Sequence, residues 1–367
     1  MPSIMKCFLF IEKIFLFFAW TFAHSWNISE ERLQHKIQQH PLTWIQDQLI
    51  CAPFSSQEIS QCLERLKKMQ GIESAGLVRI VVEGPDIRYE PLVPLNSKQL
   101  SNLDSFLSAL MKLHAICPLP PLDFCMTLAP SFDRPLLLQE TSIPIFAVSK
   151  ETHNKKVVLI PRLWNQNREL FFQQTFHSWD QKINKAFWRG GPTDGPYGFF
   201  DWSFRPRGHL ALRSRNFSDL IDARFVPSQL SDYPIDYFKQ LKLLAPFVFP
   251  QEQSIYKYLL SLDGEAAPSS FEWQLFSGSL IFKSKSNKIE WFYQGLKEGE
   301  HFISFRSDGN DLFEKLIWAM RHDNEAKTIA EKGAYFAQLH LLDEEAFVYL
   351  HHLLNRYSQL LNKQSLP

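Results

Sequence analysis

Residues 256–283 constrain the fold of this chain more than any other stretch, and they read YKYLLSLDGEAAPSSFEWQLFSGSLIFK. The first seven residues, Tyr256–Leu262, are aromatic or aliphatic apart from one lysine and one serine, which is typical of a buried strand. The dipeptide Asp263-Gly264 follows and indicates a tight turn. The pattern therefore predicts a strand that ends at this turn.

The second half of the same stretch predicts a short helix and another strand. Ser269 and Glu272 have the S-x-x-E spacing of a capping box, which indicates that a helix begins beside them. Gly278 is placed to end that helix, since glycine tolerates the left-handed conformation of a C-cap. The apolar run Ser279–Phe282 predicts the next strand.

A unit of strand, loop, short helix and strand has two interpretations. Backbone N–H groups at the start of such a helix point toward whatever lies in front of it, and a phosphate is the favoured occupant. The alternative is a plain α/β connection without a ligand, because capped helices after glycine turns are common.

The length and composition of the chain bound its architecture. A chain of 367 residues is too long for one ordinary core and predicts two domains. Its hydrophobic content of 45% and aromatic content of 14% indicate a globular, well-buried protein. The formal net charge of +0 provides no global field that attracts nucleic acid or an anionic membrane. We therefore expect no nucleic-acid partner.

The five cysteines do not have the spacing of a metal site. None forms a C-x-x-C pair, which disfavours a zinc cluster. Two interpretations stay open: the thiols are free and buried, or Cys117 and Cys125 form a disulfide. Free thiols are the favoured interpretation.

Residues 1–23 resemble a signal peptide or a membrane anchor. Lys6 forms a weak basic region, and Ile14–Ala23 is an apolar run of the length of a signal core. Glu12-Lys13 interrupts the longer run, so a buried N-terminal helix is the alternative. We expect a membrane-associated or secretory/periplasmic protein, with a cytoplasmic one as the alternative. In a secretory protein, Asn27 and Asn216 would be glycosylation acceptors.

Strands and helices alternate along the chain, which indicates an α/β layer. The predicted strands are 77–82, 123–128 and 157–160. Periodic apolar residues predict helices over 29–70, 100–113, 311–320, 324–338 and 343–361. Gly333 and Leu341-Leu342 punctuate the last three. The last three are expected to be packing helices without chemistry.

Two further segments carry residues suited to an anionic ligand. The apolar run Phe187-Trp188 leads into Arg189-Gly190-Gly191, a loop that a ligand can approach closely. A basic patch follows and is either a solvated helix face or a clamp for a diphosphate, since arginine binds phosphate through two hydrogen bonds. Its members are Arg205, Arg207, His209, Arg213 and Arg215.

The order of these motifs resembles the glycosyltransferases related to capsule-associated protein 10, which include protein O-glucosyltransferases and lipopolysaccharide- or capsule-modifying sugar transferases. The matching segments cover roughly the C-terminal half of the chain. They are FWRGGPT (187–193), IDARF (221–225), YKYLLSLDG (256–264), FSGSLIF (276–282), IEWFYQGLKEGEHFISFRSDGNDL (289–312) and DNEAKTIAEKG (323–333). The N-terminal half matches more loosely, mainly through LPPLDFCMTL (119–128).

The resemblance implies an α/β fold of the GT-B type, with two Rossmann-like domains that face each other across a cleft and with C-terminal helices. Residues 24–180 would form the acceptor-side domain and residues 181–340 the sugar-nucleotide-binding domain. Residues 341–367 would form a C-terminal helix.

The resemblance also implies an inverting, metal-independent transfer of glucose or xylose from a UDP-sugar to a hydroxyl of a glycan or protein acceptor. The UDP-sugar is a co-substrate, so no cofactor is expected. The sequence contains no D-x-D, the usual manganese-diphosphate motif of metal-dependent transferases. Charge on the departing UDP would then be stabilised by backbone N–H groups and arginine.

By position, the resemblance implies the donor-binding residues. Arg189 and Gly191 fall in the donor-binding strand and loop, and Arg207 falls on an arginine that contacts the donor phosphates. A loop and helix start would cradle the diphosphate, and its members are Gly264, Glu265, Ala266, Ala267, Ser269 and Ser270. In the glucosyltransferases an arginine occupies the position of Ser270.

The catalytic base is the main departure from the family. A gapless match places Pro130 where the family has its catalytic aspartate, and proline cannot accept a proton. Three interpretations stay open: Asp133 is the base through a rearranged loop, Asp123 is the base, or the chain is a catalytically silent homologue that binds sugar nucleotide or glycan. Asp133 is the candidate we favour, because a base must reach the acceptor hydroxyl. A structural alternative is that Asp133 caps its loop.

Overall fold

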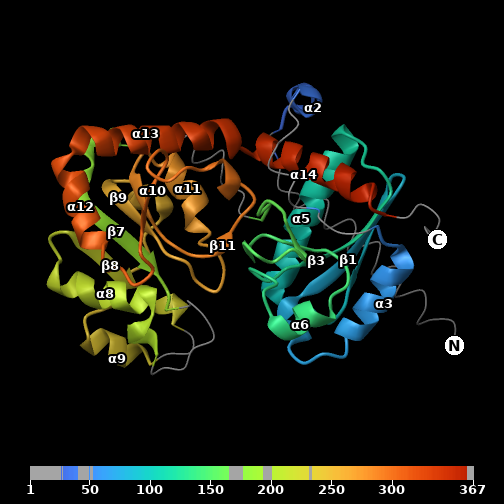
Figure 1. Cartoon of the computed structure of the whole chain (residues 1–367), viewed down its shortest axis with the longest axis horizontal. Coiled ribbons are helices and arrows are strands. Elements are labelled where there is room, and N and C mark those ends of the chain that lie inside the picture. The colour runs from blue at the N-terminus through green and yellow to red at the C-terminus, as the bar shows by residue number, and fades with distance from the viewer. Residues whose placement is uncertain are drawn as a thin grey trace, which may run out of the picture.

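The computed structural model describes residues 26, 28–39, 49, 53–164, 177–192, 201–230 and 234–361. Within these residues the chain forms two lobes, each built around a five-stranded sheet (Figure 1). We call residues 53–164 the N-terminal lobe and residues 177–340 the C-terminal lobe. The predicted signal or anchor at 1–23 and the acceptor Asn27 lie outside the described residues.

The sheet of the N-terminal lobe is mixed, with strand order β2-β1-β3-β4-β6. β1 is antiparallel to both β2 and β3, whereas β3, β4 and β6 are parallel. The strands are β1 (Leu77–Glu83), β2 (Asp86–Pro91), β3 (Leu122–Thr127), β4 (Ile145–Ala147) and β6 (Val157–Leu159). The resemblance implies a Rossmann-like domain here. A β1–β2 hairpin is not part of that pattern, so the expectation describes only the parallel strands of this sheet. Gly84, with φ of 55°, makes the hairpin turn.

The sheet of the C-terminal lobe is wholly parallel, with strand order β12-β10-β9-β7-β8. The strands are β7 (Ile183–Gly190), β8 (Ile221–Phe225), β9 (Tyr256–Ser261), β10 (Leu280–Ser284) and β12 (Ile303–Phe305). Counted in chain order within the lobe, this is the order 2-1-3-4-5 of a doubly wound fold. The expectation of an α/β fold is therefore confirmed.

Helices surround both sheets, and most predicted elements are confirmed. In the N-terminal half the helices are α2 (Glu30–Gln39), α3 (Ser56–Leu66), α4 (Ile72–Ala75), α5 (Ser97–Ile116) and α6 (Pro135–Glu140). The C-terminal lobe carries α8 (Pro206–Asn216), α9 (Ile235–Gln240), α10 (Pro250–Gln253), α11 (Ser270–Phe276), α12 (Leu312–Arg321) and α13 (Asp323–His340), and α14 (Asp343–Ser358) follows.

The unit predicted over 256–283 is present as β9, α11 and β10. Gly278 has φ of 65°, which confirms the left-handed residue after the helix. The capping box is wrong, because Ser269 precedes α11 with helical angles and its side chain makes no capping hydrogen bond. A capping residue needs an extended backbone to turn its side chain back to the helix, and here the chain enters α11 through a turn in which the Phe271 N–H donates to the Pro268 carbonyl.

Gly333 does not interrupt a helix, because α13 continues through it. A Cβ atom at this position would lie 2.5 Å from the carbonyl oxygen of His301. The glycine therefore permits the helix to approach the neighbouring backbone closely, a reason that periodicity alone does not reveal.

Three cysteines lie in the described part of the chain, Cys62, Cys117 and Cys125, and all are free and buried. The expectation of free, buried thiols is therefore confirmed at these three positions, and Cys117 and Cys125 form no disulfide with each other. Within the described residues, no helix is long and apolar enough to cross a membrane.

The last helix, α14, returns to the N-terminal lobe, whereas α13 packs on α11 and β10 of the C-terminal lobe (Figure 1). The ring of Tyr357 packs edge-on against Phe54, Phe124 and Phe146, and its hydroxyl donates to the carbonyl of Asp123 at 2.9 Å. The tail of the chain thus connects the two lobes. The division at 180 and 340 that the resemblance implies stays a prediction.

We predict that Tyr357→Phe lowers the free energy of unfolding by about 1 kcal/mol, because it removes one buried hydrogen bond and keeps the ring packing. Urea denaturation of the full chain measures this change. Tyr335→Phe is the matched control, since Tyr335 is 62% exposed, and it should leave stability unchanged. Equal stability of Tyr357→Phe and the unsubstituted chain would contradict the role of the hydroxyl.

Candidate functional site

The strand order locates the candidate site. In an open parallel sheet, ligands bind beyond the carboxyl ends of the strands, at the point where the strand order reverses. Here that point lies between β7 and β9, which are neighbours although β8 separates them in the sequence. β7 ends at Gly190 and β9 ends at Ser261, so the segments that follow them meet at this place. We call this the switch-point site.

Arg207 connects the two strand ends. Its Nη1 donates to the Gly191 carbonyl at 3.0 Å, its Nη2 to the Leu262 carbonyl at 2.9 Å and its Nε to the Asp263 carbonyl at 2.9 Å. The residue lies in the first turn of α8, after Pro206, which is well suited to that position. A guanidinium in a fixed fork geometry thus holds both loops, and it brings a permanent positive charge to the site.

Gly191 is required by close packing. A Cβ atom there would lie 2.8 Å from the carbonyl oxygen of Gln229, closer than a Cβ atom can approach another heavy atom. The predicted importance of this glycine therefore has a steric cause. The rest of that loop, residues 193–200, lies outside the described residues.

The predicted phosphate-binding loop lies beside Arg207. Gly264, Ala266 and Ala267 are buried, Glu265 and Ser269 are exposed, and Ser270 is half-buried. The Ala267 N–H donates to Ser149 Oγ of the N-terminal lobe at 3.1 Å. This loop, residues 262–269, is therefore held against both lobes, and we call it the β9–α11 loop.

Lys283 and Asp263 form a buried ion pair beneath this loop, a contact that no sequence pattern revealed. Lys283 is at the carboxyl end of β10 and Asp263 follows β9, and the two strands are hydrogen-bonded neighbours. Burial lowers the pKa of the Lys283 ammonium, and the Asp263 carboxylate opposes that shift. A lysine at the end of an apolar strand has no local signal that distinguishes it from a solvated strand end.

A second missed pair joins the lobes. Arg162, which follows β6, donates from Nη2 to the Glu290 carboxylate at 2.7 Å, and the two side chains are 9% and 2% exposed. Their separation of 128 positions leaves no sequence pattern to reveal the pair. Burial raises the pKa of the neighbouring Tyr293 hydroxyl well above its ordinary value, and the carboxylates of Glu290 and Asp263 add to the shift.

Asp133 is held in place by the backbone and one amide. Its Oδ1 accepts hydrogen bonds from Asn154 Nδ2 at 2.9 Å and from the Glu151 N–H at 3.3 Å. Its Oδ2 is buried and has no hydrogen-bond partner among the described residues. The carboxylate therefore caps its loop through Oδ1.

Asp133 also lies close to the junction of the lobes. β5 (Lys150–Glu151) pairs with β11 (Lys288–Ile289) across the junction, and we call these four residues the interlobe strand pair. Lys288 Nζ donates to the carbonyls of Gly264 and Glu265 at 2.7 and 2.8 Å. Burial lowers the pKa of Lys150 to about 8, and Asp133 opposes that shift. Contacts thus run from Asp133 to the β9–α11 loop.

The structure argues against Asp123 as a base. Its two oxygens accept hydrogen bonds from Arg79 at 2.8 and 2.6 Å, and its side chain is 2% exposed. A carboxylate held by a bidentate arginine inside a lobe cannot reach an acceptor. Pro130 is exposed in the loop after β3.

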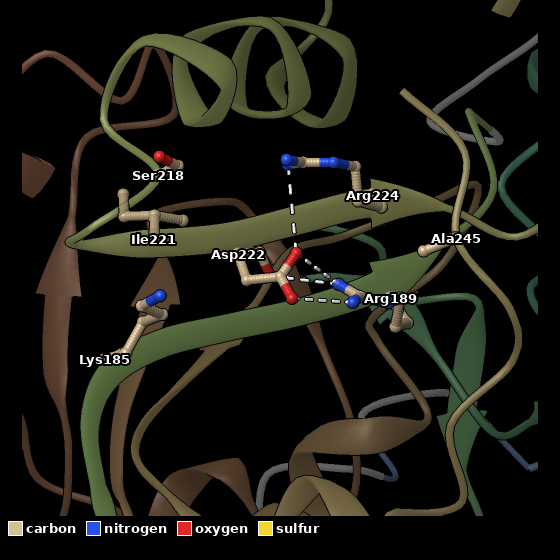
Figure 2. A pocket seen from close by; sticks show the side chains of 7 residues that line it. All are labelled: Lys185, Arg189, Ser218, Ile221, Asp222, Arg224 and Ala245. Atoms are coloured by element: carbon tan, nitrogen blue, oxygen red, sulfur yellow. Dashed lines mark hydrogen bonds and ion pairs between the residues drawn. The ribbon is translucent and has the colours of Figure 1, made fainter. Parts of the chain in front are cut away.

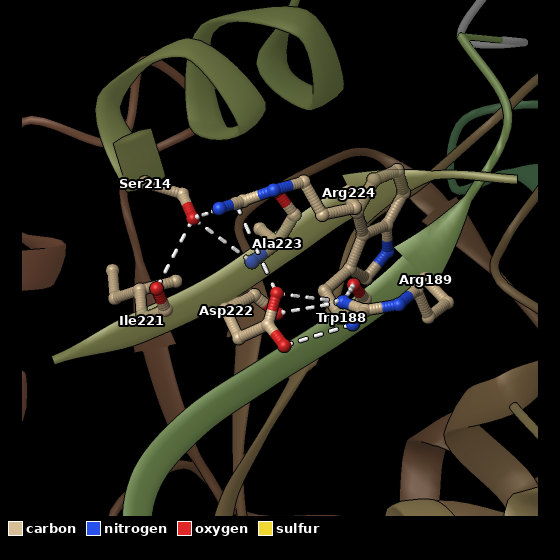
Figure 3. A network of polar contacts seen from close by, with 7 residues as sticks. All are labelled: Trp188, Arg189, Ser214, Ile221, Asp222, Ala223 and Arg224. Atoms are coloured by element: carbon tan, nitrogen blue, oxygen red, sulfur yellow. Dashed lines mark hydrogen bonds and ion pairs between the residues drawn. The ribbon is translucent and has the colours of Figure 1, made fainter. Parts of the chain in front are cut away.

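Arg189 lies in a different place from Arg207. It projects from the face of β7 opposite to Trp188, whose ring is 5.7 Å from the Arg207 guanidinium. The Arg189 guanidinium binds both oxygens of Asp222, at 3.0 and 2.8 Å (Figure 3). It also lies over the Phe187 ring, 4.2 Å from the ring centroid. The structure therefore engages Arg189 with Asp222 of β8, on the face of β7 away from Trp188.

Arg189 lines a pocket of about 370 Å³ on the β7–β8 face of the sheet (Figure 2). The other lining residues are Lys185, Ser218, Ile221, Asp222, Arg224 and Ala245. Arg224 is held there by Ser214 Oγ at 2.8 Å (Figure 3). Two arginines around one carboxylate have the arrangement of a structural ion-pair network, although the buried Arg189 Nε has no hydrogen-bond partner among the described residues.

The basic patch of α8 separates into unrelated contacts. Arg213 donates to the Gly309 carbonyl, Arg215 donates to the Leu241 carbonyl, and Arg205 lies 3.9 Å from Asp201. Arg207 is the member that contacts the strand ends. The patch is thus neither a uniform solvated face nor a clamp of several arginines.

Among the described residues there is no group of three or more His, Cys, Asp or Glu side chains arranged to hold a metal ion. Metal-independent chemistry stays a prediction.

Comparisons with known proteins identify relatives among the protein O-glucosyltransferases. Protein O-glucosyltransferase 2 of Danio rerio is 35% identical over 183 residues, which cover 50% of this chain and 34% of that protein. Protein O-glucosyltransferase 1 of Homo sapiens is 28% identical over 242 residues, which cover 61% of this chain and 59% of that protein. The chain therefore spans less than two thirds of the length of either relative.

A solved structure of Anabaena HepE in complex with UDP-glucose has 10% identity and a TM-score of 0.36, and the superposition covers 61% of this chain and 65% of that one. So low a score carries no argument about this fold. The match to a family is firmer, since Glycosyl transferase family 90 matches residues 146–365. That range is more than half of the chain and includes β7, Arg207 and the β9–α11 loop, and the chain belongs to glycosyl transferase family 90.

Proposed function

We propose that this chain is an inverting, metal-independent glycosyltransferase that moves glucose or xylose from a UDP-sugar to a hydroxyl of a glycan or protein. The observation that carries the proposal is Arg207, whose guanidinium joins the loops after β7 and β9 at the switch point of a parallel sheet. Nucleotides bind at this place in doubly wound folds. Family membership supports the same class of reaction.

The donor diphosphate binds between Arg207 and the β9–α11 loop. Backbone N–H groups of the loop donate to the phosphate oxygens, and the buried alanines allow the ligand to approach the backbone closely. The proposed contacts come from Gly191, Arg207, Gly264, Glu265, Ala266, Ala267, Ser269 and Ser270. In this proposal Arg189 does not contact the donor, and it fixes the end of β7 by binding Asp222 of β8.

The transfer inverts the anomeric centre. The acceptor hydroxyl attacks the anomeric carbon from the face opposite to UDP, the bond to the UDP oxygen breaks, and Asp133 takes the hydroxyl proton. The unpartnered Oδ2 of Asp133 supports this role, because a base needs one lone pair that the protein does not occupy. Arg207 and the loop N–H groups stabilise the charge that develops on UDP, without a metal ion.

The two lobes have separate tasks in this proposal, as in a GT-B enzyme. The C-terminal lobe holds the donor, and the N-terminal lobe carries Asp133 and the acceptor side. The relatives are protein O-glucosyltransferases, which supports a protein hydroxyl as one acceptor class, with a lipopolysaccharide or capsule sugar as the other. Localisation in the secretory pathway, periplasm or at a membrane stays part of the proposal.

A second candidate function keeps the donor site and lacks turnover. The observation in its favour is Pro130, which occupies the position where the resemblance implies the catalytic aspartate. The two candidates differ in one measurable outcome, since only the first produces free UDP together with a glycosylated acceptor.

We predict that UDP binds the full chain without divalent metal and that Arg207→Ala raises its Kd about ten-fold or more. A hydrogen bond to a charged group contributes about 1.5–3 kcal/mol, and ten-fold corresponds to about 1.4 kcal/mol. Calorimetry measures both Kd values. Arg321→Ala is the matched control, since Arg321 is exposed at the end of α12, and it should leave the Kd unchanged. No binding of UDP, UDP-glucose or UDP-xylose would contradict the proposed function.

We predict that Asp133→Asn reduces transfer from the preferred UDP-sugar about 10²-fold or more and leaves the UDP Kd within two-fold, because asparagine retains the Oδ1 acceptor but cannot take a proton. Release of UDP in the presence of a hydroxyl acceptor is the assay. Asp86→Asn, at the exposed start of β2, controls for loss of a carboxylate in the same lobe. Full activity of Asp133→Asn would place the base elsewhere, whereas UDP binding without turnover in the unsubstituted chain would favour the silent homologue.

A further inference from the structure

The interlobe strand pair contacts both halves of the candidate site. It lies between the two lobes (Figure 1), and its two strands are antiparallel, with Lys288 opposite Glu151 and Ile289 opposite Lys150. The next residues extend the junction, because the Thr152 N–H and hydroxyl both donate to the Asn287 carbonyl, at 2.7 and 2.8 Å. The junction is therefore formed by backbone hydrogen bonds in a fixed register.

On the C-terminal side, the Lys288 ammonium fixes two peptide planes of the β9–α11 loop. It binds the carbonyl oxygens of Gly264 and Glu265 at 2.7 and 2.8 Å. In a trans peptide, the carbonyl and the following N–H point in opposite directions. Lys288 therefore turns the N–H groups of Glu265 and Ala266 away from itself, as two consecutive donors.

Two consecutive N–H groups form a concave donor that binds anions, and a phosphate oxygen is a suitable ligand. A loop without a cation on its carbonyl side can rotate these planes and present a carbonyl oxygen instead, which repels a phosphate. The ammonium thus determines which polar group of the backbone the loop offers. The half-buried position of Lys288 strengthens this contact relative to one in open solvent.

On the N-terminal side, the same strand pair holds Asp133. Glu151 is the cross-strand partner of Lys288, and its N–H donates to Asp133 Oδ1. The Ser149 hydroxyl, which precedes the pair, accepts the Ala267 N–H of the loop. The loop and the carboxylate are consequently positioned by one short piece of structure.

We propose that Lys288 is a positioning residue for the donor diphosphate: it orients the Glu265 and Ala266 N–H groups of the β9–α11 loop and fixes that loop to the strand that holds Asp133. This inference rests on the proposed function, because it concerns how the same donor site is shaped. Lys288 itself lies outside the β9–α11 loop that it orients.

The test compares ligands that differ in phosphate number. Uridine, UMP and UDP are titrated into the full chain and into Lys288→Met, with calorimetry as the measurement. We expect Lys288→Met to raise the UDP Kd about ten-fold, the UMP Kd less, and the uridine Kd by less than two-fold. Lys288→Arg should restore UDP binding to within about three-fold, because arginine keeps the charge and the donors.

Lys285→Met is the matched control, since it removes a lysine three positions earlier whose side chain is 58% exposed and 3.8 Å from Glu298. It should leave all three Kd values unchanged, which separates local orientation from a general loss of positive charge. If Lys288→Met does not fold, Lys288→Gln carries the same test, since its amide retains a donor, and a smaller UDP-specific loss is expected.

Two results would overturn the inference. One is an unchanged UDP Kd in Lys288→Met, and the other is an equal loss for uridine and UDP, which indicates a purely structural role. An unsubstituted chain that is folded but binds no UDP would overturn the proposed function and this inference together. UDP binding by the unsubstituted chain, together with an unchanged UDP Kd in Lys288→Met, would overturn this inference and leave the proposed function in place.

Discussion

The hydrogen bonds from Arg207 to three backbone carbonyls are the interaction on which the rest of the candidate site depends. Carbonyl groups that leave a sheet at its carboxyl edge have lost their strand partners, and buried ones need a replacement. One guanidinium satisfies the carbonyls of Gly191, Leu262 and Asp263, which belong to loops after two different strands. The geometry of the switch-point site follows from this contact, because it fixes both loops relative to each other. The same contact places a permanent charge where a diphosphate is proposed to bind.

The lobes then complete the site together. Arg162 and Glu290 form a buried ion pair across the junction, and removal of one partner of such a pair leaves an uncompensated charge. The interlobe strand pair adds a fixed register, and α14 adds a packed helix that returns to the N-terminal lobe. These contacts hold Asp133 of one lobe and the β9–α11 loop of the other in a defined relation. The proposed inverting transfer requires that relation, because its base and its leaving group must lie on opposite faces of the sugar.

Local patterns predicted the parts of this structure that depend on local interactions. The run from Tyr256 to Phe282 encodes β9, α11 and β10, since apolar runs, a glycine turn and a left-handed Gly278 act within a few residues. The capping box failed because the chain enters α11 through a turn that gives Ser269 helical backbone angles. The Lys283–Asp263 and Arg162–Glu290 pairs could not be predicted, because their partners meet only through the sheet order. Arg189 illustrates the same limit: its position in the motif was visible, but the alternation along β7 that turns it toward Asp222 became clear only with the register of β8.

The most direct test of the central claim is a crystal structure of the full chain with UDP bound. The account predicts that the diphosphate lies within hydrogen-bond distance of Arg207 and of backbone N–H groups in the β9–α11 loop, with the Lys288 ammonium still on the carbonyls of Gly264 and Glu265. A diphosphate bound instead in the pocket of Arg189, Asp222 and Arg224, on the other face of β7, would contradict it.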